Sequence, residues 1–584
     1  MDSGKASAHS TSALTRLFKG ITLLARNPRG LFWLFVGVNM VPSACLVFTE
    51  PLSAIGRVIL LSAPLGAYLL LFSLSRRTGV TQLWLIPLLV FHAFQLVLFY
   101  LYGESVIAAD MFLNLPTTNA TEAGELLDSL WPAIILVCVL YIPTIFMAAW
   151  SVKLKTAMPR GFRRRMIVSG VAVCALTGGL ATVETTRNKD YSVRDDLYPA
   201  NIFYNLWYAV HKWQRSEAYP ETSRDFTFHA RRDTSPGGRE IYVLVIGEAS
   251  RAENWELFGY ERPTNPLLRE MGNLIPFQDA ITQSNTTHKS VPLILSAANA
   301  SHYERLYTHK SVITAFKEVG FKTVFLSNQV PNRSFTDYFA AEADVLVNVR
   351  TPLEGGLLTV NNYDEAMLPL MRRCIDSLQG NLFIVMHTYG SHFNYKERYP
   401  EGFGRFKPDN AMEIELKNKA ELINAYDNSV LYTDRFLHST MRILEKTGSD
   451  AVLFYTPDHG EDLLDDRRKK FLHASPNPTY YQLHIPMLVW FSENFKTARP
   501  ECYRAAQKNC HAPVATNIVF HTLLDLAQIQ TPYLDPTSSV VNPQFTARPR
   551  MYLNDHDQPV NYYRAGLKQE DRDMIDKRGM DHSE

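Results

Sequence analysis

The sequence predicts two different parts: an α-helical membrane domain with five transmembrane helices, followed by an exported α/β domain. Five nearly uncharged apolar stretches lie between Gly30 and Val183, whereas the composition beyond about Arg187 is that of an ordinary soluble domain. From Glu240 onward, short β-branched runs alternate with helical stretches. We therefore expect a membrane domain over residues 1–183, an interfacial linker over 184–239 and an exported domain over 240–584.

The length of the apolar stretches indicates the membrane domain. A helix needs roughly 20 apolar residues to cross the hydrocarbon core of a bilayer. Five stretches without Asp, Glu, Lys or Arg come close to or exceed this length, at residues 30–49, 58–75, 80–102, 131–150 and 166–183. So many uncharged runs in close succession argue against buried core helices. The chain has 59 Lys and Arg against 58 Asp and Glu, so it has no overall excess of positive charge that would favour binding to nucleic acid.

The loops between these stretches predict the orientation. Lys and Arg gather in the N-terminal arm, after the second stretch and after the fourth, whereas the loop over 103–130 has no Lys or Arg. Basic loops stay on the cytoplasmic side of a membrane. The 103–130 loop and everything after Val183 are therefore expected outside. The first stretch is long and lacks a small-residue cleavage site, so we expect an uncleaved anchor.

An aromatic segment over 198–213 predicts a further helix within the linker. Its Trp and Tyr content without a long apolar core is typical of an amphipathic helix in the membrane interface. A helix packed on the exported domain is an equally supported alternative.

Five apolar, β-branched runs predict strands in the exported domain, at residues 241–246, 323–326, 382–386, 451–455 and 487–491. Continuous apolar strands separated by helices predict a parallel sheet covered on both faces. Ligands of such folds bind at the carboxyl ends of the strands. The residues that follow each run are therefore the candidates for a site.

Acids and histidines follow three of these runs. Glu248 follows the first run, His387 and His392 follow the third, and Asp458 and His459 follow the fourth. Carboxylate oxygens and neutral imidazoles from separate strand ends are typical ligands of zinc or manganese. The alternative, that these side chains only form loop hydrogen bonds, is weaker because three strand ends carry them.

A hydroxyl-rich segment over 282–292 precedes a predicted helix and offers nucleophiles beside such a metal. Together with Glu248 and the Asp-His-Gly-Glu run over 458–461, it resembles the phosphoethanolamine transferases of bacterial inner membranes, members of the alkaline phosphatase and sulfatase superfamily. The resemblance extends over nearly the whole chain. It implies an exported α/β domain of the alkaline phosphatase/sulfatase type, and a multi-pass inner-membrane protein with its catalytic domain in the periplasm.

The resemblance also implies roles for particular residues. In that family the threonine three residues before a Ser-Val-Pro sequence is the nucleophile, here Thr287, with Thr286 and Ser290 as competing hydroxyls. One zinc ion is expected, with a second as an alternative. The implied metal ligands are Glu248, Thr287, Asp458 and His459. Histidines that line the phosphoryl-group site in relatives match His392 and His473, and the secondary candidates are His387, Glu461 and His484.

Three polar residues of the outside loop form a further candidate group. Asn114, Thr118 and Glu122 have the i, i+4, i+8 spacing that places side chains on one helical face. The resemblance implies that this face holds an ethanolamine head group, with Glu122 against its ammonium. A solvated helix face is the alternative.

Cysteine usage and the C-terminal tail bear on the acceptor. Only Cys374, Cys502 and Cys510 lie in the exported domain, where an oxidising space would allow a Cys502–Cys510 bridge. Lipid A-modifying relatives carry several disulfides there, which three cysteines cannot form. This difference, and a tail over 535–545 that resembles the core-modifying branch, favour the core heptose of lipopolysaccharide over lipid A.

The resemblance implies transfer of phosphoethanolamine from phosphatidylethanolamine, a membrane lipid, to lipopolysaccharide through a phosphoethanolamine-threonine intermediate. Zinc on the threonine oxygen would lower its pKa and neutralise phosphoryl charge. Three alternatives stay open: a phosphoglycerol transferase of the lipoteichoic-acid synthase type, a periplasmic phosphatase or sulfatase, and a catalytically silent membrane scaffold. A sulfatase would be supported by a Cys/Ser-x-Pro-x-Arg sequence, which this chain lacks.

The charge asymmetry of the loops predicts where fused reporters work. A reporter that is active only outside the cytoplasm is expected to be active after Glu584 or within residues 119–124, and inactive near Arg163. Reporter activity in intact cells measures this. An active fusion at Arg163 together with a silent one at the C-terminus would reverse the orientation.

Overall fold

The structure is a computed structural model that describes residues 22–583 except 51, 103–106, 118–123, 125–126, 128–129, 189–190, 234–236, 351–360 and 412. The chain forms two compact units. The first comprises Met1–Ile107 and Leu130–Trp207, and the second comprises Ala108–Ser129 and Tyr208–Glu584. The domain boundaries expected at residues 183 and 239 stay a prediction.

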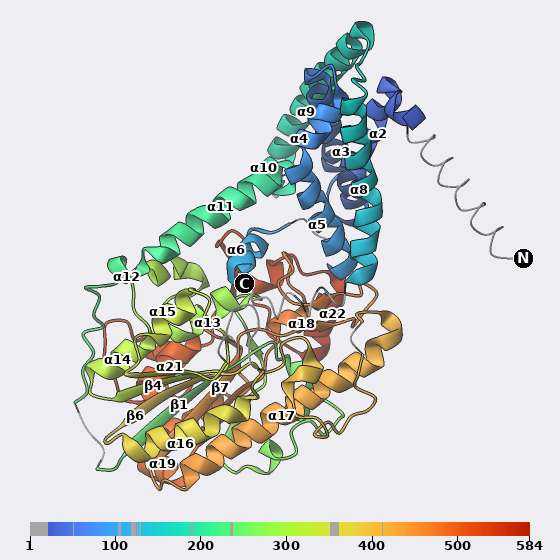
Figure 1. Ribbon diagram of the computed structural model, residues 1–584. Coiled ribbons are helices and arrows are strands. Elements are labelled where there is room, and N and C mark those ends of the chain that lie inside the picture. Colours follow the sequence, from blue (N-terminus) through green and yellow to red (C-terminus); the bar gives the residue numbers. More distant parts are fainter. Residues whose placement is uncertain are drawn as a thin grey trace, which may run out of the picture. The chain divides into compact units, whose positions relative to one another are not determined.

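Apolar helices build the first unit (Figure 1). Four are long and apolar enough to cross a membrane: α2 (Pro28–Thr49), α3 (Ala54–Leu74), α8 (Trp131–Lys153) and α9 (Arg160–Arg187). The predicted third span is divided into α4 (Thr78–Trp84) and α5 (Ile86–Tyr102), which are bent by 63°. Pro87 accounts for the break, because it has no N–H to donate to the carbonyl one turn earlier. The five predicted spans thus correspond to four continuous helices and one bent pair.

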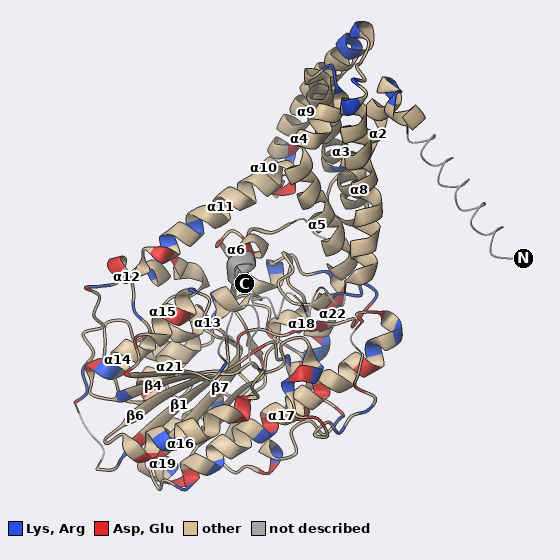
Figure 2. Ribbon diagram, in the orientation of Figure 1, with Lys and Arg blue, Asp and Glu red and all other residues tan. Residues whose placement is uncertain are grey.

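The first unit buries one histidine that is hydrogen-bonded on both sides. His92, the one ionisable residue of the predicted third span, lies between two tyrosine hydroxyls, 3.0 Å from Tyr68 Oη and 2.6 Å from Tyr198 Oη. Lys and Arg gather where α9 begins, and few charged residues interrupt α2, α3 or α8 (Figure 2). The cost of placing a charge in hydrocarbon accounts for this distribution.

Helix α11 (Ala200–Glu217) occupies the aromatic segment of the predicted linker, between α10 (Val193–Asp196) and α12 (Tyr219–Thr222). One face is apolar and open: Phe203, Trp207 and Trp213 are 58%, 60% and 45% exposed. The opposite face carries Lys212, which is buried and donates to Asp557. From Tyr208 onward, where α11 belongs to the second unit, its polar face therefore contacts residues of that unit, and the apolar face has the composition of an interfacial helix.

A seven-stranded sheet forms the centre of the second unit, in the order β2-β10-β7-β1-β6-β4-β5. Four of the five predicted strands run parallel, next to a fifth parallel strand that was not predicted, β5, whereas β10 is antiparallel to both β7 and β2. The predicted parallel arrangement is wrong for residues 487–491, because residues 458–486 contain no helix long enough to cross the sheet. The strands are β1 (Glu240–Gly247), β2 (Leu274–Phe277), β4 (Lys322–Ser327), β5 (Val345–Asn348), β6 (Leu382–His387), β7 (Asp450–Pro457) and β10 (Met487–Phe491).

Helices cover both faces of this sheet (Figure 1). α14 (Val312–Glu318) and α21 (Ile518–Leu526) lie on one face, and α16 (Met367–Ser377) and α17 (Lys419–Glu445) on the other. Phe316 stacks on Phe383 with ring centroids 4.0 Å apart, one of many apolar contacts in the core. The remaining helices and strands are α6 (Ala109–Thr117), α13 (Thr287–Leu295), α15 (Phe335–Ala340), α18 (Tyr480–Leu483), α19 (Glu493–Ala498), α20 (Pro500–Asn509), α22 (Gln569–Arg578), β3 (Ala280–Ile281), β8 (Asp462–Leu463), β9 (Phe471–Leu472), β11 (Val514–Ala515), β12 (Met551–Leu553) and β13 (Pro559–Asn561).

Cys502 and Cys510 are both free, so the bridge that the sequence would allow is not formed. Helix α20 explains the difference. Eight residues of helix separate the two Cα atoms by about 12 Å, beyond the reach of a disulfide. Cys502 packs instead against the apolar core.

Candidate active site

Parallel pairing brings the predicted strand-end residues to one edge of the sheet. Strand β1 lies between β6 and β7, with Ile246 beside His387 and Gly247 beside Pro457. Glu248 follows β1 directly, and the Asp-His-Gly-Glu run follows β7 directly. The strand register therefore produces the convergence that the sequence predicts.

A tight main-chain crossing fixes Glu248. The next residue, Ala249, has a left-handed φ of 51°, which is strained for a residue with a side chain. Gly390, in the loop after β6, has a φ of 49°, and a Cβ there would lie 2.8 Å from both the nitrogen and the carbonyl oxygen of Glu248. Ser391 donates its N–H to the same oxygen at 2.9 Å. Glycine alone fits this crossing without displacement, so the loops after β1 and β6 are held together.

Thr287 is the first residue of helix α13. Its Oγ1 lies 3.4 Å from both carboxylate oxygens of Glu248 and 3.2 Å from His459 Nε2. The competing Ser290 is fully buried and donates its hydroxyl to a main-chain carbonyl at 2.7 Å. Thr287 is partly exposed, and a helix N-terminus favours a phosphoryl group. The geometry therefore favours Thr287 over Ser290 as a reacting hydroxyl.

Asp458 and His459 are completely buried after β7. Asp458 Oδ1 accepts the N–H groups of Ala249 and His459, at 3.1 and 2.8 Å. Its Oδ2 has no hydrogen-bond donor among the described residues and lies 3.2 Å from His459 Nε2. Nδ1 of His459 donates to the carbonyl of Gly460 at 2.9 Å, which leaves Nε2 as an acceptor. Two acceptor atoms therefore face each other, an arrangement that a bound cation would satisfy.

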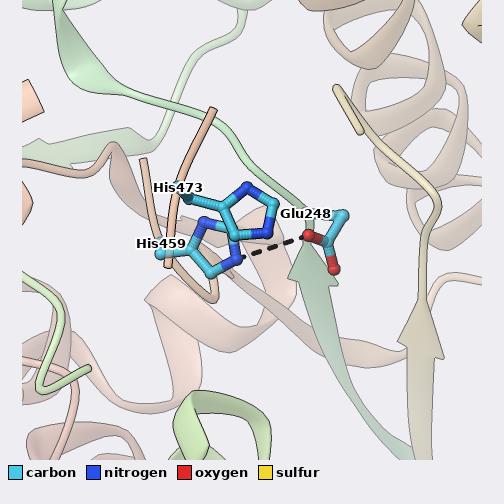
Figure 3. A group of neighbouring side chains, drawn as sticks. All are labelled: Glu248, His459 and His473. Atoms are coloured by element: carbon cyan, nitrogen blue, oxygen red, sulfur yellow. Dashed lines mark ion pairs between the residues drawn. The ribbon is translucent and has the colours of Figure 1, made fainter. Parts of the chain in front are cut away.

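His473 completes a group of ligand-type atoms with Glu248 and His459 (Figure 3). One atom from each residue lies within 4.8 Å of the other two. Nδ1 of His473 contacts Glu461 Oε2 at 2.7 Å, which fixes the ring. Burial lowers the pKa of both histidines to about 4, so both rings are neutral at pH 7, the state that binds a metal.

This donor set fits a divalent cation. Glu248 and Asp458 are both fully buried, and among the described residues no Lys or Arg lies within ion-pair distance of Asp458. A buried carboxylate without a positive partner is costly. Carboxylate oxygens, imidazole nitrogens and the Thr287 hydroxyl together supply the oxygen and nitrogen ligands that zinc accepts.

A cavity of about 160 Å³ opens beside the group. Glu248, Thr287 and His473 line it, together with His387 and His392. His387 is buried, and neither of its ring nitrogens has a hydrogen-bond partner in the part of the chain that the structure describes. His392 contacts the main-chain carbonyl of the following residue through Nδ1 at 2.6 Å. Five predicted site residues therefore surround one space.

Two secondary candidates lie outside this space. His484 contacts Tyr480 Oη at 2.8 Å and Glu253 at 3.5 Å, and it does not line the cavity. Glu461 lies behind the site, where Tyr395 donates its hydroxyl to Oε1 at 2.9 Å. The structure therefore gives Glu461 a supporting position and places His484 in a separate cluster.

The predicted head-group residues lie at the limit of what the structure describes. Thr118 and Glu122 are outside the described residues, and so is the side chain of Asn114 in α6. Their role stays a prediction.

Asp110 of α6 belongs to a buried ion cluster that the sequence analysis missed. Its carboxylate lies 2.6 Å from Lys289 Nζ and 3.3 Å from His288 Nε2, and Lys289 also pairs with Asp557 at 3.0 Å. Burial alone would raise the pKa of Asp110, but Lys289 and His288 hold it well below its ordinary value. Because His288 and Lys289 follow Thr287, the cluster fixes the first turn of α13. No local pattern reveals partners so far apart in the sequence.

Residues after β4 also line the cavity and were missed. Gln329 donates to the carbonyl of Thr388 at 2.9 Å and lies 3.4 Å from Glu248 Oε2. Asn332 and Ser334 continue this wall. The predicted strand over 323–326 could have indicated these residues, because they follow its carboxyl end, which lies at the same edge of the sheet as the site.

Comparison with known proteins agrees with this fold. A family model described as sulfatase matches residues 240–529, so these residues form a sulfatase-family domain. The chain is similar to phosphoethanolamine transferases in particular. Phosphoethanolamine transferase EptC from Escherichia coli O18:K1:H7 is 29% identical over 333 residues, which are 55% of this chain and 57% of EptC. The match thus spans little more than half the length of that relative.

Two further relatives extend the comparison. Kdo(2)-lipid A phosphoethanolamine 7''-transferase from Salmonella typhimurium is 29% identical over 294 residues, 50% of either chain. Integral membrane protein lipooligosaccharide phosphoethanolamine transferase A (EptA) from Neisseria meningitidis has a TM-score of 0.69 at 21% identity and covers 87% of this chain and 97% of its own. Its likeness shows the fold, so the predicted combination of apolar helices and α/β domain is confirmed.

The second unit has a solved relative that contains metal. The periplasmic domain of EcEptC from Escherichia coli, in complex with Zn, has a TM-score of 0.53 at 28% identity and covers 59% of this chain and 97% of that domain.

The crossing of Gly390 over Glu248 predicts an unequal effect of two glycine substitutions. Gly390→Ala and Gly402→Ala both place a side chain at positive φ, which costs about 1–2 kcal/mol, but only at Gly390 would the new Cβ meet main-chain atoms, at a further cost of about 1–3 kcal/mol. We expect the larger loss of thermal stability for Gly390→Ala in the detergent-solubilised protein. Equal shifts of the unfolding temperature would contradict the crossing.

The unsatisfied oxygen of Asp458 predicts weaker metal binding in Asp458→Asn. Removing one charged ligand is expected to weaken zinc binding by at least about tenfold. Elemental analysis after equilibration at a series of zinc concentrations measures this. Asp450→Asn, at the opposite end of β7, is the matched control. Equal zinc affinity in Asp458→Asn and the control would exclude Asp458 from the site.

Proposed function

We propose that the protein is a zinc-dependent phosphoethanolamine transferase of the bacterial inner membrane, with its catalytic domain in the periplasm. The observation that carries this proposal is the place of Thr287 Oγ1 at the start of α13, 3.2 Å from His459 and 3.4 Å from Glu248, within a sulfatase-family domain. The similarity to EptC, itself a phosphoethanolamine transferase, supports the identity of the transferred group.

Glu248, Thr287, Asp458 and His459 would hold one zinc ion, with His473 beside them as a further ligand or as a contact of the phosphoryl group. The zinc complex of the EcEptC domain supports this choice of metal. When bound, zinc supplies a Lewis acid that lowers the pKa of the Thr287 hydroxyl and offsets charge on the phosphoryl oxygens. A second ion stays an alternative.

The proposed reaction consists of two displacements at phosphorus. Thr287 Oγ attacks the phosphorus of phosphatidylethanolamine, the bond to the glycerol oxygen breaks, and diacylglycerol leaves with the proton that the threonine loses. An acceptor hydroxyl then attacks the phosphoethanolamine-threonine, gives up its own proton and releases the Thr287 hydroxyl. Nδ1 of His392 is engaged by a main-chain carbonyl, so Nε2 is the ring's proton acceptor beside the cavity. We assign it to the attacking hydroxyl.

Membrane attachment supports a lipid as the donor, and similarity to relatives supports lipopolysaccharide as the acceptor. The candidate spans would keep the exported domain at the surface from which a lipid donor must be taken. The relative named for Kdo(2)-lipid A supports a glycolipid acceptor of the lipopolysaccharide class. Within that class the core heptose is favoured, because the exported domain has only three cysteines and a tail of the core-modifying type.

The nucleophile assignment predicts the outcome of Thr287→Ala. Full-length wild-type protein, given labelled phosphatidylethanolamine and no acceptor, is expected to carry the label on the peptide that contains Thr287, whereas Thr287→Ala carries none. Lipopolysaccharide from cells with the wild-type protein should gain a phosphoethanolamine increment, which mass spectrometry locates on core heptose or lipid A.

The neighbouring hydroxyls are the controls. Thr286→Ala and Ser290→Ala are expected to keep the label on Thr287. A label on Thr286 or Ser290, or undiminished transfer by Thr287→Ala, would show that the nucleophile is misassigned.

A further inference from the structure

A second cavity, of about 300 Å³, lies in the exported unit apart from the catalytic one. Residues 208–215 of α11 form one wall, the 3₁₀ helix η4 (Ala300–Tyr307) forms another, and the turn before β13 closes it. Its lining combines tyrosine rings with charged and amide groups. The cavity is therefore neither an apolar packing defect nor a simple water pocket.

Hydrogen-bonding groups at this cavity are left without protein partners. Tyr303 and Tyr307 are only 5% and 7% exposed, yet neither hydroxyl has a hydrogen-bond partner among the described residues. The guanidinium of Arg215 lies over the ring of Tyr307, 3.9 Å from its centroid. In the described part of the chain, no carboxylate lies within ion-pair distance of Arg215. Neither hydroxyl oxygen is among the buried polar atoms without a partner, so both are accessible at the cavity and available to a ligand.

The other charged residues around the cavity differ in whether they form ion pairs within the protein. Lys212 donates to Asp557 at 2.8 Å, and Asp557 also accepts from Tyr208 at 2.9 Å and pairs with Lys289 at 3.0 Å. This pair is therefore internal to the protein. Glu304 is exposed at the wall and His211 lies on the α11 side. Arg215 remains as the cation that is free of a carboxylate, and its planar fork suits a phosphate or carboxylate group.

A third, smaller cavity lies between this cavity and the candidate active site. It has a volume of about 60 Å³ and shares Lys212 and Tyr303 with the Arg215 cavity. The same small cavity shares His288, Asn332 and Ser334 with the catalytic cavity. The small cavity therefore lies between the Arg215 cavity and the catalytic one and adjoins both.

We propose that the Arg215–Tyr303–Tyr307 cavity binds an anionic oligosaccharide, the phosphate- or carboxylate-bearing part of the acceptor glycan. Aromatic rings pack against the apolar faces of sugar rings, the two hydroxyls bond to sugar hydroxyls, and the guanidinium binds the anionic group. The polar lining does not suit the acyl chains of a lipid donor. This inference rests on the proposed transferase function and specifies where the acceptor is held.

The test separates binding of the acceptor from loading of Thr287. Full-length protein in detergent is loaded with labelled phosphatidylethanolamine and then given core oligosaccharide released from lipopolysaccharide by mild acid, either intact or after removal of its phosphates. We expect Arg215→Gln to raise the KM for intact oligosaccharide about tenfold, the effect of losing one charge-assisted contact. The wild-type protein should show the same rise with dephosphorylated oligosaccharide, and Arg215→Gln should no longer distinguish the two.

Two variants and one direct measurement complete the design. Tyr307→Phe, which removes one cavity hydroxyl, should raise KM to a smaller extent, whereas Arg224→Gln, an exposed arginine outside the cavity, should behave as wild type. Calorimetric binding of intact oligosaccharide to unloaded protein needs no transfer step. It therefore tests the site even if Thr287 never becomes labelled, the outcome that would instead reject the proposed function.

Four results would overturn the inference. One is an unchanged KM and unchanged binding in Arg215→Gln, and another is equal affinity of the wild-type protein for the two oligosaccharides. The third is slower loading of Thr287 by phosphatidylethanolamine in Arg215→Gln with normal acceptor kinetics, which would assign the cavity to the lipid donor. Competition by inorganic phosphate as strong as that by intact oligosaccharide would likewise reject a sugar-binding site.

Discussion

The carboxylate of Asp458 holds the candidate site together because its two oxygens have different roles. Oδ1 accepts two main-chain N–H groups and so joins the loop after β1 to the loop after β7. Oδ2 is left facing His459 Nε2 with no donor among the described residues. Binding of one oxygen by the backbone fixes the direction of the other. Asp458 therefore supplies negative charge to the site and also fixes the direction in which its free oxygen points.

Helix α11 shows how one short segment can serve two environments. Its apolar face carries exposed Trp207 and Trp213, and its polar face carries Lys212 and Arg215. The periodicity of 3.6 residues separates these faces by about half a turn. Lys212 forms an ion pair with Asp557, whereas Arg215, one turn further along the helix, lies over the ring of Tyr307. The helix thereby places a ligand-type cation beside a face suited to the membrane surface.

The sequence could predict those features that depend on neighbours in the chain or on neighbouring strands. Glu248 and Asp458 were found because each directly follows an apolar run, and parallel register makes those positions adjacent. The break before Pro87 was not predicted, because hydropathy averages over a proline. Asp110 and Gln329 escaped because their partners are distant in sequence, and only tertiary packing brings them to the site. The head-group role of Asn114, Thr118 and Glu122 in the outside loop rests on their spacing and on the family resemblance alone.

The ion cluster of Asp110 has a consequence for work with shortened proteins. Asp110 precedes the fourth candidate span, whereas its partner Lys289 lies on α13, the helix of the proposed nucleophile, and is fully buried. A soluble fragment that begins after the last span keeps the lysine but loses this carboxylate, which lies 2.6 Å away. Lys289 then depends on Asp557, 3.0 Å away, to offset its buried charge, and the cluster loses one of its anions. The start of α13 should then loosen in the fragment, so its turnover would understate that of the intact enzyme even with every catalytic residue present.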